Sequence, residues 1–190
     1  MKKFELTSEF VTNIFGTKLF RIKALVEFGD VEAGEFGGYV EKEENLSHDG
    51  NAWVYGDARV SGDARVSGDA RVSGDARVYG NAEVYGYARV SGNAEVYGNA
   101  WVCGDARVYG YARVYGDADY AYAHGFGSVN RTTTFFRLKD GGVGVRCGCF
   151  YGTLGEFREK VRETHKDTKK AREYLMLADL MELRFTKEEE

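Results

Sequence analysis

The sequence predicts a mainly β protein: a parallel β-helix of six-residue repeats with a small β-rich cap before it and a small α+β unit after it. Three observations predict this fold. A hexad recurs without interruption, apolar residues alternate with polar ones inside each hexad, and the flanking segments lack the repeat. The 190 residues therefore divide into a cap over 1–47, a repeat region over 48–125 and a C-terminal unit over 126–190.

The repeat region carries the strongest signal. From His48 to Asp119 hexads follow one another, and from Val54 they read VYGDAR VSGDAR VSGDAR VSGDAR VYGNAE VYGYAR VSGNAE VYGNAW VCGDAR VYGYAR VYGDAD. A helix is excluded, because a period of 3.6 does not divide six and each glycine would cost roughly 1 kcal/mol. The Ala-x-Val alternation predicts a short half-buried strand, and Gly followed by Asp or Asn predicts the turn. Such strands bury their Val and Ala only if successive coils stack.

These hexads resemble the repeat of the hexapeptide-repeat superfamily, whose β-helix is left-handed, triangular in section and winds three hexads into each coil. The resemblance implies that residues 18 apart stack and that four coils span Gly50 to Asp119. It also implies a homotrimer, since three such prisms commonly associate. In one respect the chain departs from the pattern: its glycine stands two places after the valine, where the family more often has it one place after.

The segment that leads into the first coil gives a narrower resemblance. Residues 18–28, KLFRIKALVEF, alternate apolar and basic side chains and predict a strand. With the turn-rich, acidic stretch behind them they form LFRIKAL…FGDVEAGEFGGYVEKEENLSHDGNAWVYGDARV, which resembles the start of YdcK-like proteins. These are uncharacterised bacterial and phage proteins, often labelled putative transferases. The resemblance covers residues 18 to about 120 and implies a phage or mobile-element association and, by analogy, an anti-defence or host-interaction role.

The C-terminal unit begins with a predicted β-hairpin over residues 132–150, which turns at the stretch KDGG. Thr153 and Glu156 have the spacing of a capping box and predict a helix near 154–165. A second helix is predicted at about 168–185. Its expected buried face consists of Ala171, Tyr174, Leu175, Ala178 and Met181.

Composition narrows the classes of function. The formal net charge of −4 gives no reason to expect broad nucleic-acid binding. No stretch approaches the roughly 20 apolar residues of a membrane span, and the start MKKFELTSEF lacks the apolar run of a signal peptide. Three cysteines without metal-site spacing indicate reduced thiols. We therefore expect a cytoplasmic protein, in the host cytoplasm if the chain is phage-encoded, with no membrane partner.

Catalytic signals are sparse. The hexapeptide resemblance implies an acetyl-CoA-dependent acetyltransferase with a histidine at a seam between subunits, and His124 is the best candidate for that residue. Its competing interpretation is a structural or surface role, and His48 is expected to pack at the first coil. Histidines 48, 124 and 165 do not have the paired spacing of a zinc hydratase, so no metal and no cofactor are expected. Cys147 and Cys149 share one strand parity and are expected in the core.

An 18-residue coil assigns each outward side chain to one of three faces. On the first face, Trp53 is followed by three arginines, Arg71, Arg89 and Arg107, about 4.8 Å apart. Their mutual repulsion is offset either by water and corner carboxylates such as Asp69 and Asp105, or by an anionic partner. The second face carries three tyrosines, either stacked for strand stability or free for a partner. These tyrosines are Tyr79, Tyr97 and Tyr115.

Because the array has no inserted loop in which a reaction centre could assemble, the sequence favours a non-catalytic binding scaffold. The predicted partner is a small anionic ligand or a host protein that contacts the arginine and tyrosine faces. Two alternatives remain open. One is a hexapeptide-repeat acyltransferase that uses acetyl-CoA, and the other is a structural spacer in an assembly.

Overall fold

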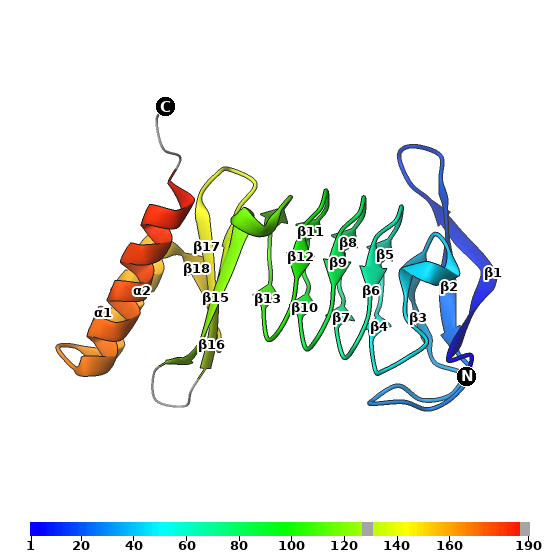
Figure 1. The fold of residues 1–190 in the computed structure, drawn as a ribbon, viewed down its shortest axis with the longest axis horizontal. Helices are drawn as coiled ribbons and strands as arrows, with labels where there is room; N and C mark the ends of the chain where they lie inside the picture. Colours follow the sequence, from blue (N-terminus) through cyan, green and yellow to red (C-terminus); the bar gives the residue numbers. More distant parts are fainter. Residues whose placement is uncertain (127–130, 187–190) are drawn as a thin grey trace.

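The computed structural model describes residues 1–126 and 131–186. It is an elongated molecule in which the N-terminal cap, the stacked coils and the C-terminal unit follow one another along the long axis (Figure 1). The fold class is confirmed: a parallel β-solenoid of about four turns lies between two antiparallel sheets, and two helices close the C-terminal end.

The elements have the following bounds. In the cap lie β1 Phe4–Thr12, β2 Lys18–Ala24, β3 Phe36–Val40 and a 3-10 turn at Glu43–Asn45. In the coils lie β4 Trp53–Val54, β5 Arg59–Val60, β6 Arg65–Val66, β7 Arg71–Val72, β8 Arg77–Val78, β9 Glu83–Val84, β10 Arg89–Val90, β11 Glu95–Val96, β12 Trp101–Val102, β13 Arg107–Val108 and β14 Arg113–Val114. After a 3-10 turn at Asp117–Asp119 come β15 Tyr120–Phe126, β16 Arg131–Arg137, β17 Val143–Cys147, β18 Phe150–Thr153, α1 Leu154–His165 and α2 Lys169–Phe185.

The coils wind with the predicted period of 18 residues. Each coil strand pairs in parallel with the strand three hexads later, so that Arg71 stands beside Arg89 and Val72 beside Val90. Three sheets result: β4-β7-β10-β13 forms the first face, β5-β8-β11-β14 the second and β6-β9-β12 the third. The backbone bonds run from each coil to the next, as from the Arg71 N–H to the Ala88 carbonyl at 2.9 Å. The predicted stacking is therefore confirmed.

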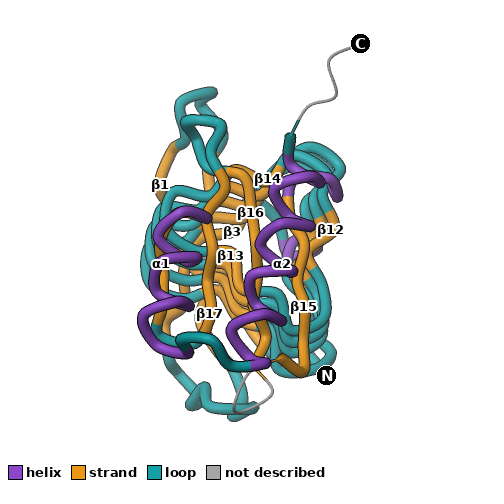
Figure 2. The backbone as a smooth tube through the Cα atoms, turned by 90° about the vertical axis from the view of Figure 1, so that its left-hand side faces the viewer, coloured by secondary structure: helices purple, strands orange, loops and turns teal. Residues whose placement is uncertain are grey.

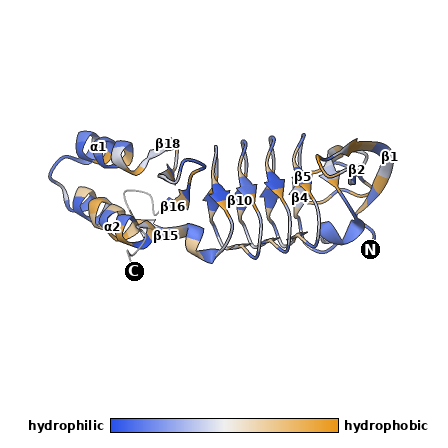
Figure 3. Ribbon diagram, turned by 90° about the horizontal axis from the view of Figure 1, so that it is seen from above, coloured by the Kyte–Doolittle hydropathy of each residue, from blue (hydrophilic) through white to orange (hydrophobic). Residues whose placement is uncertain are grey.

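The core of the solenoid is a column of small side chains. The Val and Ala of every hexad from Ala52 to Val114 are fully buried, or within 1 % of it. In Figure 3 the coil strands carry hydrophilic and hydrophobic colours next to each other, as the Arg-Val pairs of the hexads require. Such a narrow core leaves no interior cavity for a ligand, so any binding site of the coils lies on their outer faces.

The N-terminal cap closes the first coil by continuing its sheet. β1, β2 and β3 are antiparallel, and β3 then pairs in parallel with β5 of the second face. Under this cap lies Trp53, which is fully buried and contacts Phe4 and Phe28 edge to face at 6.2 and 5.4 Å. The prediction that Trp53 lies on the outer surface is therefore wrong, because residues 1–31 fold over the first coil and cover it.

Side chains satisfy the carbonyl groups that the first coil leaves unpaired. The Lys3 ammonium donates to the carbonyls of Gly50 and Ala52 at 3.3 and 2.9 Å, and the Asn45 amide donates to those of Gly62 and Ala64 at 3.0 and 2.8 Å. The last coil instead leaves backbone N–H groups unpaired, and side-chain oxygens accept hydrogen bonds from them. Asp117 accepts from the Trp101 N–H and Thr134 from the Arg107 N–H, both at 2.9 Å. Both open ends of the solenoid are therefore capped by polar groups of the opposite kind.

Burial of Lys3 makes the stability of the cap depend on pH. Lys3 is 3 % exposed, and its burial lowers the pKa of its ammonium from 10.5 to about 8, against the opposing carboxylates of Asp49 and Asp69. Between pH 8 and 10.5 the unfolded chain holds this proton more tightly than the folded one, so the free energy of unfolding rises with pH across that window. We expect urea unfolding to show this rise in the parent protein and a flatter profile in Lys3→Met. Equal slopes in the two proteins would contradict it.

The C-terminal unit is a four-stranded sheet held between the last coil and the two helices (Figure 2). In β16 Phe136 enters the solenoid core while Phe135 enters a second core with α1 and α2. The hairpin, both helices and the Thr153–Glu156 capping box are as predicted. Residues 120–125, which the sequence assigned to the repeat region, instead pair with β16 as part of β15.

Two predicted core positions differ in this unit. Cys149 is exposed because β17 ends at Cys147 and the chain turns before β18, so the expected strand parity does not reach it. Leu175 is only partly buried, while Phe185 at the end of α2 is fully packed instead. Neither α1 nor α2 combines the length and apolar character that crossing a bilayer requires, among the residues that the structure describes.

Candidate ligand-binding faces

The arginine column of the first face is in register, as predicted. Arg71, Arg89 and Arg107 occupy equivalent positions of β7, β10 and β13, on neighbouring strands of one sheet. The first of them is neutralised by the cap: the Arg71 guanidinium donates to the Asp30 carboxylate at 2.6 Å, and the Tyr55 hydroxyl donates to the same group at 3.1 Å. Burial alone would raise the pKa of Asp30, but these two donors outweigh it and lower that pKa.

In the described structure the corner carboxylates Asp69 and Asp105 form no ion pair with the arginines of this face. Asp69 accepts a hydrogen bond from the Asn51 amide at 2.6 Å rather than pairing with an arginine. The carboxylate that pairs with Arg71 comes from the loop between β2 and β3, far away in the sequence. Arg89 and Arg107 are exposed and take part in no ion pair within residues 1–126 and 131–186.

The basic surface continues into the C-terminal unit. Arg146 of β17 lies over the Tyr109 ring, with 4.9 Å between its guanidinium carbon and the ring centroid. The rings of Tyr109 and Tyr151 meet edge to face at 5.1 Å. Arg89, Arg107 and Arg146 together therefore form a basic and aromatic surface across the junction of the two units. We call it the first-face surface.

The tyrosines of the second face mainly contact one another. Tyr79 and Tyr97 stack at 5.0 Å with nearly parallel rings, and Tyr97 meets Tyr115 edge to face at 5.3 Å. Burial, and then the nearby Glu95 carboxylate, raise the pKa of Tyr79. Only the last member of the column, Tyr115, is widely exposed, at 61 %. Stacking between coils therefore accounts for the inner two tyrosines, and Tyr115 is free for a partner.

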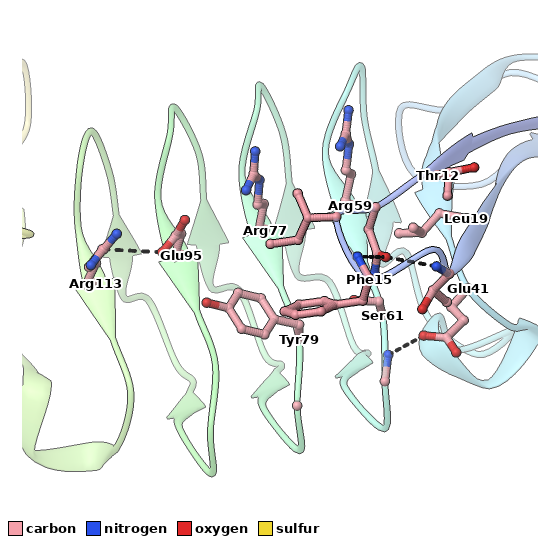
Figure 4. A pocket seen from close by; sticks show the side chains of 15 residues that line it. Thr12, Phe15, Leu19, Glu41, Arg59, Ser61, Arg77, Tyr79, Glu95 and Arg113 are labelled. Carbon is pink, nitrogen blue, oxygen red and sulfur yellow. Dashed lines mark hydrogen bonds and ion pairs between the residues drawn. The ribbon is translucent and has the colours of Figure 1, made fainter.

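A cavity of about 550 Å³ opens on the second face, beneath the turn that joins β1 to β2. The turn contributes Ile14 and Phe15, and the coils contribute Arg59, Arg77 and Tyr79. Figure 4 shows the two rings along one side of the cavity and the two arginine side chains along the other. An amphipathic hollow of this kind suits a ligand with one flat end and one anionic end.

Charge pairing leaves two of the arginines at this cavity without a carboxylate partner among the described residues. Arg59 and Arg77 are neighbours on β5 and β8. The next position of the column holds Glu95, which pairs with Arg113 on its other side at 3.3 Å (Figure 4). The remaining carboxylate at the cavity, that of Glu41, accepts the Gly62 N–H at 2.7 Å. The two free guanidiniums are therefore available to an oxyanion.

The histidines lie far from one another, and none is at the cavity. His48 packs in the cap, where its ring stacks on Phe4 at 4.4 Å and its Nε2 lies 2.7 Å from Glu43, which confirms its expected structural place. His124 lies exposed on β15 with Nδ1 2.9 Å from the Thr132 hydroxyl. His165 ends α1 and stacks on Tyr174. In the described part of the chain no three His, Cys, Asp or Glu side chains gather as a metal site.

Arg59, Arg77 and Phe15 were not among the residues predicted from the sequence. Two sequence signals point toward them: the apolar pair Ile14-Phe15 stands in a tight turn that contains Gly16, and the outward strand position of the second face is acidic only at Glu95. The sequence does not reveal that the turn lies over these coils, because that placement depends on how the cap sheet joins β5.

Taken together, uninterrupted coils, three outer sheets and polar caps at both ends define a hexapeptide-type β-solenoid protein. Comparison with family models gives a more particular result. The YdcK beta solenoid repeat model matches residues 52–68, 58–74, 64–78, 70–86, 88–104 and 102–116. All six matches lie within the repeat region, and they are consistent with a YdcK-like β-helix protein. A comparison of the chain with curated proteins gives no match.

Proposed function

We propose that this protein is a non-catalytic binding scaffold that holds an anionic partner on the arginine and tyrosine faces of its solenoid. The observation that carries the proposal is the first-face surface, where Arg89 and Arg107 stand in register and neither forms an ion pair in the described structure. Two like charges on adjacent strands repel each other, and a bound anion would relieve that repulsion. A bidentate arginine fork gives such a contact both energy and geometry.

The surroundings of His124 favour binding over catalysis as the function of this protein. The candidate base of an acetyltransferase, His124, lies exposed on β15 and hydrogen-bonds a hydroxyl, and among the described residues no carboxylate forms a hydrogen bond with its ring. A catalytic histidine needs such an orienting partner and a substrate site within reach. The acyltransferase is therefore the second choice, and no observation specifically favours a spacer.

Assembly and location are part of this proposal. We propose a homotrimer in the cytoplasm, with a host protein or a small anion as the partner in a phage or host-interaction setting. Support for an assembly comes from the exposed aromatic side chains at the ends of the second and third faces, Tyr115 and Trp101, at 61 and 51 % exposure. Aromatic residues of this kind are enriched in the cores of protein interfaces.

The test uses a defined polyanion. We expect tripolyphosphate to bind the parent protein in calorimetry, and Arg89→Glu with Arg107→Glu to weaken that binding roughly tenfold or more, because each lost charge-assisted contact is worth about 1.5–3 kcal/mol. The matched control is Arg65→Glu with Arg172→Glu, which changes the net charge equally at exposed positions elsewhere. Equal losses in both double variants would mean that overall charge, and not the first-face surface, governs binding, and the proposal would be wrong.

A further inference from the structure

We infer that the cavity beneath the β1–β2 turn is a small-molecule site for an oxyanion carried on a flat ring, the chemistry of an aryl phosphate. This inference deepens the proposed function, on which it rests for the second face, by naming a ligand class for that face; the cavity uses residues that the first-face surface does not contain. Its volume of about 550 Å³ lies within the range of small-ligand sites, which is roughly 300–1,000 Å³.

Arg59 and Arg77 are the residues that would bind the anionic group of the ligand. They stand in register on adjacent strands, so their backbones lie about 4.8 Å apart. Figure 4 shows both guanidinium groups pointing the same way from the coils. No ion pair of the described residues neutralises either of them, since Glu95 is engaged by Arg113. One phosphate or sulfonate group can accept from both forks, which a carbonyl or an uncharged hydroxyl could not match in energy.

Phe15 and Tyr79 are the residues that would contact the flat ring of the ligand. Phe15 is 84 % exposed and its neighbour Ile14 is 90 % exposed, at the tip of a turn where polar residues are usual. Tyr79 already stacks on Tyr97, which holds its ring in place. A ring that enters the cavity can cover the apolar surface of Phe15 and Ile14 and remove it from water.

The turn that carries Phe15 is held in shape before any ligand arrives. The Asn13 side-chain oxygen accepts the backbone N–H groups of Phe15 and Thr17, both at 2.9 Å, and Gly16 supplies the left-handed residue with φ +82°. Leu19 at the base of the hairpin is buried. A preformed turn reduces the entropy lost on binding, and this favours a small ligand over a surface that must reorganise.

The experiment titrates 1-naphthyl phosphate into the full chain by calorimetry, beside inorganic phosphate and 1-naphthol. We expect 1-naphthyl phosphate to bind at least tenfold more tightly than either fragment, because only it fills both ends. Arg59→Gln with Arg77→Gln should weaken that binding at least tenfold, and Phe15→Ser should weaken it severalfold. The matched control, Arg65→Gln with Arg172→Gln, removes the same charge at exposed positions outside the cavity and the first face and should leave binding unchanged.

Several outcomes would overturn the inference. They are an absence of binding, equal affinities for 1-naphthyl phosphate and inorganic phosphate, and an equal loss in the control pair. Far-ultraviolet circular dichroism verifies that each variant keeps the fold. A different result would contradict the proposed function: tripolyphosphate binding that does not change when Arg89 and Arg107 are replaced. The two tests therefore use different probes and different arginines.

Discussion

Replacing Trp53 by alanine is expected to lower the free energy of unfolding by about 3–5 kcal/mol, the usual range for deleting a large buried aromatic side chain. Trp53 is fully buried between the first coil and the cap, with Phe4 and Phe28 packed against its ring. Its loss opens a cavity that the parallel strands around it cannot close, because their spacing is fixed by backbone hydrogen bonds. Urea unfolding followed by circular dichroism measures the change.

The matched control is Trp53→Phe. The indole N–H of Trp53 is buried without a hydrogen-bond partner in the described structure, and an unsatisfied buried donor costs roughly 1–3 kcal/mol. Phenylalanine keeps most of the packing and removes that donor, so we expect a much smaller loss of stability than for alanine. If both variants lost the same stability, the packing of the ring would not be the reason that Trp53 matters.

The second large effect is expected at the corner glycines. Gly74 has φ +68°, and a Cβ built on it would lie 3.1 Å from the backbone nitrogen of Gly92 in the next coil. Gly74→Ala therefore combines a left-handed conformation that costs an L-residue about 1–2 kcal/mol with a contact that neither backbone can easily relieve. We expect a total loss of about 2 kcal/mol or more in the free energy of unfolding.

Two further glycines distinguish the cost of the left-handed conformation from the cost of the close contact between coils. Gly56 has φ +60° but only one atom near its Cβ position, at 4.0 Å, so Gly56→Ala should show the conformational cost alone. Gly116 has an extended backbone with φ −152° and nothing within 4 Å, so Gly116→Ala should change stability by no more than about 0.5 kcal/mol. Equal losses at all three glycines would contradict the stacking argument.

Function on such a scaffold depends on which side chains align along a face. The 18-residue winding places Arg71, Arg89 and Arg107 in one column, and the cap then neutralises only the first of them through Asp30. We therefore expect the proposed anion binding toward the C-terminal end of the first face, and the inferred small-molecule site near the N-terminal turn on the second face.

Every repeating feature of the fold could be predicted from the sequence alone. A period of six with valine, alanine and glycine in constant positions leaves one way to bury the apolar side chains, so the coils, the three faces and the columns on them were predictable. The capping box and the two C-terminal helices were predictable for a similar reason, since their signals lie within a few residues of each other.

The segments that cover the repeat could not be predicted from its periodicity. Trp53 occupies the same place in its hexad as Arg71, yet it is buried because the distant residues Phe4 and Phe28 fold over it. Asp30 and the Phe15 turn reach the coils in the same way, through the pairing of β3 with β5. Local patterns specify which side of a strand faces inward. Contacts between segments far apart in the sequence depend on how whole elements pack, and periodicity carries no information about that.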